Sequence, residues 1–354
     1  MRRENVAALH ASRRNSKQIK MRKIQINSLL IIFALLVSIG ASFSLAQTPL
    51  PKPTPKPHNK VRKIIKNSGD TPAEKSIAVD AGVNISLCVS EGKLKINGWE
   101  RNEIRAFVNN GSQVGFYVLQ KKKANPVWVK VLGYDPAIIK ETDAEECLAG
   151  DEIELDVPRN AIVNIKSNSS EMAIDSVGKV SVENAGGDVF LNNIGRGIEA
   201  RTYEGDVTVE NSSGAMSLFS TTGNIIAFDV SPSEIGDIFK AKTSNGAVTL
   251  KNVGQRQLEV GSNSGSINFN GEFLIGGQYN FGTSNGAIVL TIPQNSSCLI
   301  NASYGYGAFA SELPLKNIEK NTPSKTQTLS AQIGDGDCSL KLTTVSGAIR
   351  IRKQ

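Results

Sequence analysis

Residues 177–227 read VGKVSVENAGGDVFLNNIGRGIEARTYEGDVTVENSSGAMSLFSTTGNIIA, and this stretch decides the fold. A glycine recurs in it on a nine-residue grid, at Gly178, Gly187, Gly205, Gly214 and Gly223, and Arg196 fills the one vacancy. Beyond Gly223 the spacing roughly doubles, through Gly246, Gly265 and Gly286. Glycine at such positions predicts tight corners, because a left-handed backbone or a close backbone approach leaves no room for a Cβ atom.

The residues two and four places after each grid position are all apolar. They are Val180 and Val182, Val189 and Leu191, Ile198 and Ala200, Val207 and Val209, Met216 and Leu218, and Ile225 and Ala227. The positions between them are mostly polar or small. Alternation with a period of two predicts short strands, each with one buried and one solvated face.

Strands this short cannot bury an apolar face alone, so successive units must stack. Two strands per coil predict an all-β fold, a β-solenoid over residues 159–354 with about 18 to 21 residues per coil. TSNGAVTL at Thr243 and TSNGAIVL at Thr283 predict longer strands in the later coils. An antiparallel β-sandwich is the alternative, since it also shows short alternating strands. The regular grid favours the solenoid.

Residues 76–158 show the same chemistry less regularly and predict a β-rich N-terminal cap, with strands over 103–108, 114–120, 127–134 and 152–157. A cap is needed because an open solenoid end presents unpaired backbone groups. The polar, lysine-rich stretch 311–330 predicts a loop inserted before the last coil.

Residues 1–46 resemble a secretory signal peptide, with a basic start, an apolar stretch from Leu29, and small residues at Ser44 and Ala46 that fit cleavage before Gln47. Residues 1–20 are consistent with an over-extended start, in which case Met21 is the initiator. The Pro- and Lys-rich stretch 47–75 predicts an extended tether. The expected location is extracytoplasmic: periplasm, cell envelope or secreted. The alternative is an uncleaved leader that makes a single-pass membrane anchor.

The formal net charge of +7 is concentrated in the leader, because residues 1–46 carry eight Lys or Arg and one Glu. Six more Lys or Arg precede residue 67, and residues 67–354 carry a net charge of −6. A folded nucleic-acid-binding body is therefore disfavoured. Contact with a membrane is expected only through the leader, if it stays uncleaved.

Four cysteines lie in the exported part, and an oxidising compartment permits disulfides there. We expect Cys88 to pair with Cys147, because both lie in the first half of the body. Cys298 and Cys338 are predicted to point inward. If they lie two coils apart, strand spacing separates them by about 9 to 10 Å, which is too far for a disulfide.

No catalytic residue and no cofactor are predicted. The two histidines, His10 and His58, lie in the leader and the tether, so histidine-dependent catalysis is excluded from the body. With an 18-residue coil, Asp188, Asp206 and Asn224 stack on one another and are the candidate ligands for Ca²⁺. The interpretation that we favour is that they cap local backbone groups, leaving no metal site.

Outward aromatic residues are candidate stacking platforms for carbohydrate, although ordinary packing explains them as well. They are Phe190, Tyr203, Phe228, Tyr304 and Tyr306. 

The leader, the segment LCVSEGKLKINGWERNEIRA from Leu87 and the strand repeats through SGAIRIR at Ser346 resemble the putative-adhesin family of bacterial β-strand-repeat proteins. That family is a domain of unknown function. The resemblance implies an extracytoplasmic bacterial protein with a repetitive β fold, and it transfers no catalytic residue.

The function expected is that of an exported, envelope-associated, non-enzymatic β-repeat protein that acts as an adhesin-like binding module or scaffold. Its expected partner is a cell-surface or envelope polymer or protein. Two alternatives stay open: a carboxylate-dependent polysaccharide-active enzyme on a β-helix, and a membrane-anchored envelope sensor.

Overall fold

The computed structural model describes residues 73–118, 125–138, 140, 143, 146–234, 236–321 and 326–354. All of them belong to one unit, Arg62–Gln354. The predicted signal peptide and almost all of the predicted tether lie outside the described residues. Within the described ranges, no helix is long and apolar enough to cross a membrane.

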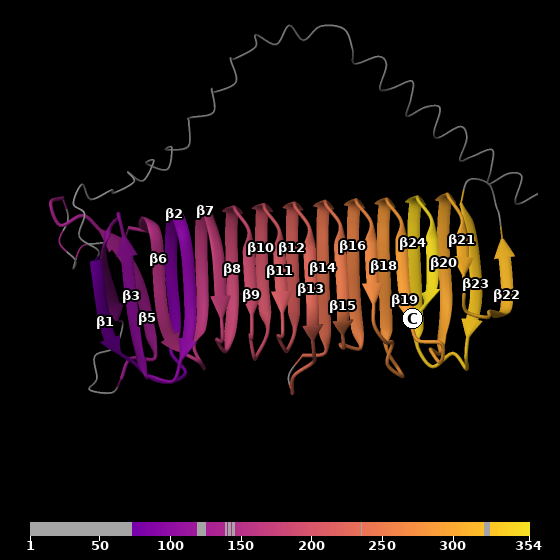
Figure 1. Ribbon diagram of the computed structural model, residues 1–354, viewed down its shortest axis with the longest axis horizontal. Coiled ribbons are helices and arrows are strands. Elements are labelled where there is room, and N and C mark those ends of the chain that lie inside the picture. Colours follow the sequence, from indigo (N-terminus) through magenta and orange to yellow (C-terminus); the bar gives the residue numbers. More distant parts are fainter. Residues whose placement is uncertain are drawn as a thin grey trace, which may run out of the picture. The chain divides into compact units, whose positions relative to one another are not determined.

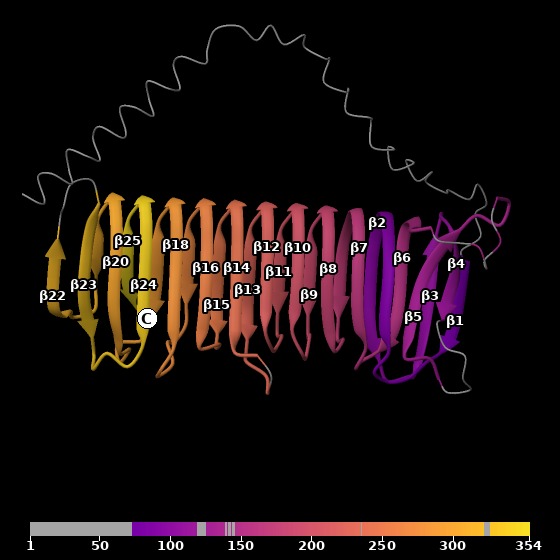
Figure 2. The ribbon, with the colours of Figure 1, turned by 180° about the vertical axis from the view of Figure 1, so that it is seen from behind.

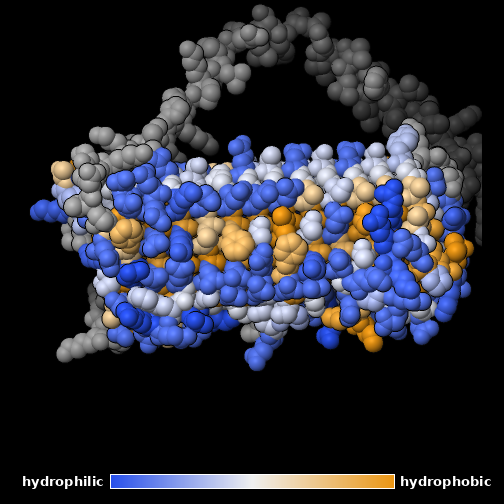
Figure 3. Space-filling view, in the orientation of Figure 1, coloured by the Kyte–Doolittle hydropathy of each residue, from blue (hydrophilic) through white to orange (hydrophobic). Residues whose placement is uncertain are grey.

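Two facing layers of parallel strands enclose the core (Figures 1 and 2), and hydrophilic residues predominate on the face seen in Figure 3. Layer A contains, in spatial order, β8 (Lys179–Gly186), β10 (Ile198–Glu204), β12 (Met216–Thr222), β14 (Ile238–Asn245), β16 (Gln257–Ser264), β18 (Gln278–Asn285), β24 (Ser339–Ser346) and β20 (Cys298–Tyr306). Layer B contains β9 (Val189–Asn192), β11 (Val207–Glu210), β13 (Ile225–Val230), β15 (Val248–Val253), β17 (Ile267–Asn270), β19 (Ile288–Ile292), β25 (Ile349–Lys353) and β21 (Phe309–Ser311).

The predicted β-solenoid is confirmed, because equivalent residues of successive coils pair in parallel register. Ile198 lies between Val180 and Met216, each 18 residues away in sequence. The antiparallel sandwich is thereby excluded for this part of the chain. The inward residues that the grid predicts, Val180 through Ala227, are all buried, none of them more than 3% exposed.

Later coils are longer, and one exceeds the predicted range. Met216 pairs with Phe239, a step of 23 residues, because an insertion follows β13. The next two steps, to Leu258 and Tyr279, are 19 and 21 residues, as expected. The longer coils are filled by aromatic rings, since Phe239, Phe269 and Phe281 are fully buried.

The N-terminal part consists of β1 (Ala73–Ala78), β2 (Asn84–Trp99), β3 (Glu103–Asn109), β4 (Gln113–Val118), β5 (Trp128–Tyr134), β6 (Leu148–Pro158) and β7 (Ile162–Asp175). The long strand β7 runs through both layers, pairing with β8 and then with β9. Strand β2 pairs in parallel with β7 along nearly its whole length and therefore forms a full rung of the stack. Antiparallel pairs β1–β3, β3–β6 and β4–β5 complete this end.

At the other end, the chain does not stack in sequence order. Strands β24 and β25 lie between the β18–β19 coil and the β20–β21 pair, and they make parallel pairs on both sides. We call β24 and β25, with the corner between them, the inserted coil. In Figure 1 this yellow coil is seen between β18 and β20.

The loop predicted over 311–330 is wrong for most of that range. Residues there form β22 (Lys316–Asn321), which pairs antiparallel with β23 (Gln327–Ile333), and β23 pairs in turn with β20. All six residues of β22 are exposed and alternate little in polarity, with Lys316, Glu319 and Lys320 among them. A charged edge strand of this kind discourages pairing with other chains.

Both cysteine pairs form disulfides in the structure. Cys88 is joined to Cys147 with their Cα atoms 4.5 Å apart. Cys298 is joined to Cys338, with a Cα separation of 4.3 Å, so the expected separation of two coils is wrong. That expectation assumed stacking in sequence order, whereas the inserted coil brings Cys338 directly beside the start of β20.

Glycines form a continuous column at the corner that leads from layer A to layer B. A Cβ atom on Gly205, Gly223, Gly246, Gly265 or Gly286 would overlap the carbonyl oxygen of the corner glycine one coil earlier. Close backbone approach is therefore why glycine is required here, as predicted.

Buried hydroxyl groups line the inside of this corner and bond to the glycine carbonyls. They are Ser220 to Gly205 (3.0 Å), Thr243 to Gly223 (2.8 Å), Ser262 to Gly246 (2.9 Å), Thr283 to Gly265 (2.9 Å) and Thr344 to Gly286 (3.1 Å). A buried carbonyl without a partner is destabilising, so each hydroxyl satisfies the corner beside it.

We predict that Gly205→Ala strongly destabilises the stack, whereas Gly282→Ala does not. Gly205 has a φ of 137° and abuts Gly187, so alanine adds about 1–3 kcal/mol of backbone strain to a steric overlap. Gly282 has no atom within 4 Å of where its Cβ would lie. Urea unfolding followed by circular dichroism measures both, and equal midpoints for the two variants would contradict the glycine column.

Candidate binding groove

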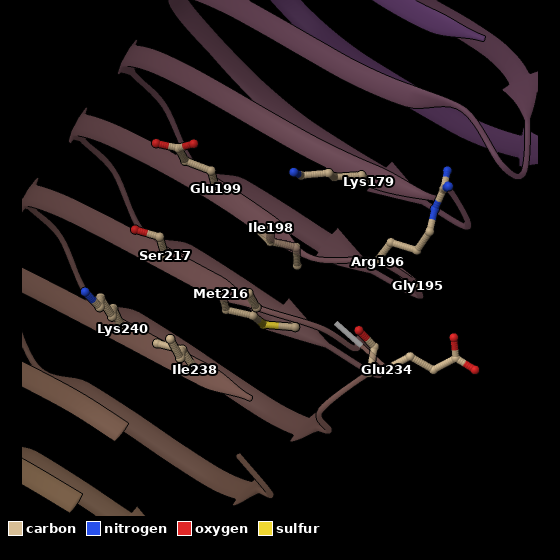
Figure 4. Close-up of a pocket in the computed structure, with 12 residues that line it drawn as sticks. Lys179, Gly195, Arg196, Ile198, Glu199, Met216, Ser217, Glu234, Ile238 and Lys240 are labelled. Atoms are coloured by element: carbon tan, nitrogen blue, oxygen red, sulfur yellow. The ribbon is translucent and has the colours of Figure 1, made fainter. Parts of the chain in front are cut away.

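A large hollow lies on the outer face of layer A, across β8, β10, β12 and β14 (Figure 4). Two of its lining residues, Gly195 and Ala215, carry little or no side chain, while Lys179 and Ile238 carry long ones. The insertion after β13 contributes Ser233 and Glu234 to its wall. The hollow has a volume of about 760 Å³, within the usual range of small-ligand sites.

A second hollow of about 590 Å³ continues the first along the same face. The two share Ile238 and Lys240 in their linings, so together they form one groove, which we call the layer A groove. It extends from β8 to β24, and its far part is lined by Gln257, Glu259, Gln278, Asn280, Ser339 and Lys341. Seven adjacent strands, about 4.8 Å apart, give it a length of about 29 Å.

The floor and the rim of the groove differ in chemistry. Ala215 and Ile238 give the first hollow an apolar surface, and charged side chains of both signs stand around it. Figure 4 shows Lys179 and Glu199 on the neighbouring strands β8 and β10, and Lys240 two strands further along the groove, on β14. The arrangement offers amide, hydroxyl and amino groups at regular intervals above an apolar base.

Glu259 is held as an anion in this groove. Its carboxylate lies 2.5 Å from the ammonium of Lys242 and 3.6 Å from that of Lys240. The hydrogen bond from Lys242 is the main cause that lowers the pKa of Glu259, and the charges of both lysines add to it. Glu199 likewise lies 3.7 Å from Arg201 on the neighbouring part of β10.

The predicted calcium ligands lie at the layer A to layer B corner, outside this groove. Asp206 donates its backbone N–H to Asp188 (2.8 Å), Asn224 donates its N–H to Asp206 (2.7 Å), and Ala247 donates its N–H to Asn224 (2.9 Å). The side-chain amide of Asn224 also donates to both carboxylate oxygens of Asp206. Each of these side chains thus accepts a backbone hydrogen bond from the next coil, whereas the expectation was that they cap local backbone groups.

The part of the chain that the structure describes contains no group of three or more His, Cys, Asp or Glu side chains that could hold a metal ion. 

The candidate aromatic platforms separate into exposed and buried residues. Tyr203 and Tyr306 are 70% and 73% exposed, and Phe190 is also exposed. Phe228 is half-buried. Tyr304 is only 5% exposed and stacks against Phe309, so its expected outward position is wrong.

Tyr203 lies beside another hollow of about 500 Å³ on the outer face of layer A, near the corner. Lys166, Glu183, Arg201 and Phe219 also line it. The guanidinium of Arg201 lies 6.0 Å from the centre of the Phe219 ring, so part of this aromatic surface is already covered by a cation.

Sequence reasoning did not identify the layer A groove. Two signals for it were present in the sequence. One is the small residues shortly before two adjacent strands, Gly195 and Ala215, and the other is the longer spacing between Gly223 and Gly246 that marks an insertion. Together, the small residues give a shallow floor and the insertion gives a wall beside it.

Comparison with known proteins identifies the family. Residues 147–352, more than half of the chain, match the family model described as Toastrack DUF4097, and the chain therefore belongs to this family of unknown function. The resemblance to the putative-adhesin β-strand-repeat proteins is confirmed. A search of curated proteins gives no match.

Two solved structures are similar over most of the chain. One is a putative cell adhesion protein from Clostridium sporogenes, with 12% identity and a TM-score of 0.25, covering 80% of this chain and 100% of that one. The other is a putative lipid binding protein from Parabacteroides distasonis, with 13% identity and a TM-score of 0.32, covering 82% of this chain and 99% of that one.

We predict that Lys242→Met raises the pKa of Glu259 toward its ordinary value of about 4.3, because the main hydrogen-bond donor is removed. In the wild type the lowered pKa stabilises the fold at pH values above the pKa of Glu259 in the unfolded chain. This stabilisation is lost as the pH falls through the pKa of Glu259 in the folded protein. The pair is partly exposed, so it contributes less than about 1 kcal/mol. Carboxyl NMR titration measures the shift, and the matched control is Lys251→Met, which removes an exposed lysine on β15 of layer B.

Proposed function

We propose that the protein is an exported, envelope-associated binding module that holds an extended envelope polymer or protein in the layer A groove without chemically changing it. The groove carries this proposal, because it presents hydrogen-bonding groups on seven successive strands along one straight face. A ligand made of repeating units makes a similar contact at every rung, so weak contacts add up along its length.

The side-chain chemistry supports holding rather than cleavage. A general acid needs a raised pKa, whereas that of Glu259 is lowered and its carboxylate is engaged by two lysines. The stacked residues Asp188 and Asp206 accept backbone hydrogen bonds and lie outside the groove. We therefore place no catalytic residue in the groove, and we propose that binding requires neither Ca²⁺ nor a cofactor.

The two disulfides support an extracytoplasmic location, since such bonds persist in oxidising compartments. They agree with the secretory leader that the sequence predicts. Residues 67–354 carry a net charge of −6, which disfavours nucleic acid as the partner.

The test is an array of glycans and cell-wall polymers probed with the leaderless protein, with and without Ca²⁺. We predict that Ser217→Trp, which places an indole in the groove on β12, abolishes the binding found with the wild type. The matched control is Thr208→Trp, because Thr208 is a half-buried outward residue of similar size on β11 of layer B. Loss of binding by both variants, or by neither, would contradict the assignment of the groove.

The array also separates the proposal from the enzymatic alternative, which the presence of Glu199 and Glu234 in the groove keeps open. Bound polymer is recovered and its length measured. Shortened polymer chains, or new reducing ends that are absent with Glu199→Gln or Glu234→Gln, would show that the protein is a carboxylate-dependent enzyme and not a binding module. Binding that is lost when a chelator is added would instead support a calcium site.

A further inference from the structure

Strands β20 to β23 are attached to the rest of the stack through the inserted coil. Strand β20 pairs with β23 and with β24, and β21 pairs with β25. Neither β20 nor β21 pairs with β18 or β19 within the described residues. The strands on both sides of the inserted coil are therefore joined to each other only by the short connection 293–297 and by the coil itself.

The inserted coil fits its slot through the same contacts that join every other pair of coils. Its inward residues Leu340, Leu342, Ile349 and Ile351 are at most 1% exposed. Its corner glycine, Gly347, abuts Gly286 on one side, and Gly307 abuts Gly347 on the other. Because the contacts are generic to the repeat, an identical coil from a second chain meets the same partners in the same register.

The segment 334–338 that leads into the inserted coil is built as a tight, fixed turn. Gly334 and Gly336 adopt left-handed φ values of 58° and 84°. The hydroxyl of Ser297 accepts hydrogen bonds from the backbone N–H groups of Asp335, Gly336 and Asp337 (2.9, 2.9 and 3.2 Å). The Cys298–Cys338 disulfide then joins the last residue before β24 to the first residue of β20.

We propose that the inserted coil is an exchangeable element, and that the Cys298–Cys338 disulfide decides which chain it completes. With the bond formed, the coil is tied to its own β20. In a chain that lacks the bond, the coil pairs with β18 and β19 of a second copy, which returns its own coil in exchange. The product is a closed, two-fold dimer of the kind that domain swapping gives.

The double variant that tests the proposal is Cys298→Ser with Cys338→Ser. Its matched control is Cys88→Ser with Cys147→Ser, which removes the other disulfide and leaves the inserted coil tied to its own β20. After incubation at high concentration, light scattering coupled to size exclusion is expected to show the first pair of substitutions shifting from monomer to dimer mass. The control is expected to remain monomeric. If the first variant does not fold, the wild type is measured in a dithiol reductant, which converts the S–S bond to two thiols and is itself oxidised to a cyclic disulfide.

Exchange is then distinguished from other contacts by a cross-link. Asn280 of β18 pairs with Lys341 of β24. One population carries Asn280→Cys and the other Lys341→Cys, both in the Cys298→Ser, Cys338→Ser background, and they are mixed before oxidation. A disulfide between position 280 of one chain and position 341 of the other supports exchange. A dimer without that cross-link, a monomer throughout, or the same cross-link when Cys298 and Cys338 are intact would overturn the proposal.

Discussion

One peptide group per coil, the one that follows each corner glycine, determines how the coils stack. At Gly205 and Asp206 its carbonyl oxygen accepts the buried hydroxyl of Ser220, and its N–H donates outward to Asp188. The peptide group is thus bonded on both sides by side chains of the neighbouring coils. This turn allows the chain to pass from layer A to layer B within few residues, and it requires that the glycine lie directly against the glycine of the coil before it. The apolar interior, the parallel register and the straightness of the stack all depend on this corner.

The sequence predicted the repeated part well because the residues of each coil specify its strands and its corner locally. The period of two around Val207 and the glycine before it specify a strand and a corner without reference to distant residues. The chemistry of the corner was also present in the sequence, since a Ser or Thr lies three residues before the corner glycines Gly223, Gly246, Gly265, Gly286 and Gly347. The carboxylate of Asp188 accepts the backbone N–H of Asp206 in the next coil, so this contact is not the local capping that the sequence suggested.

The ends of the stack could not be predicted in this way. Every coil presents the same glycine and apolar positions to its neighbours, so the repeat itself does not specify which coil lies next to which. The position of β24 between β18 and β20, and with it the proximity of Cys298 to Cys338, depends on a choice among nearly equivalent partners. The layer A groove was not predicted for a related reason. Its shape depends on residues such as Gly195 and Ala215 that are not part of the repeated pattern, and only that pattern was visible in the sequence.

The order of strands at the C-terminal side also affects how the protein is made. Strands β24 and β25 are translated after the strands on both of their sides. A ribosome that stalls within residues 316–338 therefore releases a chain whose β18 and β20 have bare edges facing each other across an unfilled rung. Unpaired strand edges of this kind pair with the strands of other chains, so incomplete copies are prone to aggregation. The stack is therefore complete only once β24 and β25 have been synthesised.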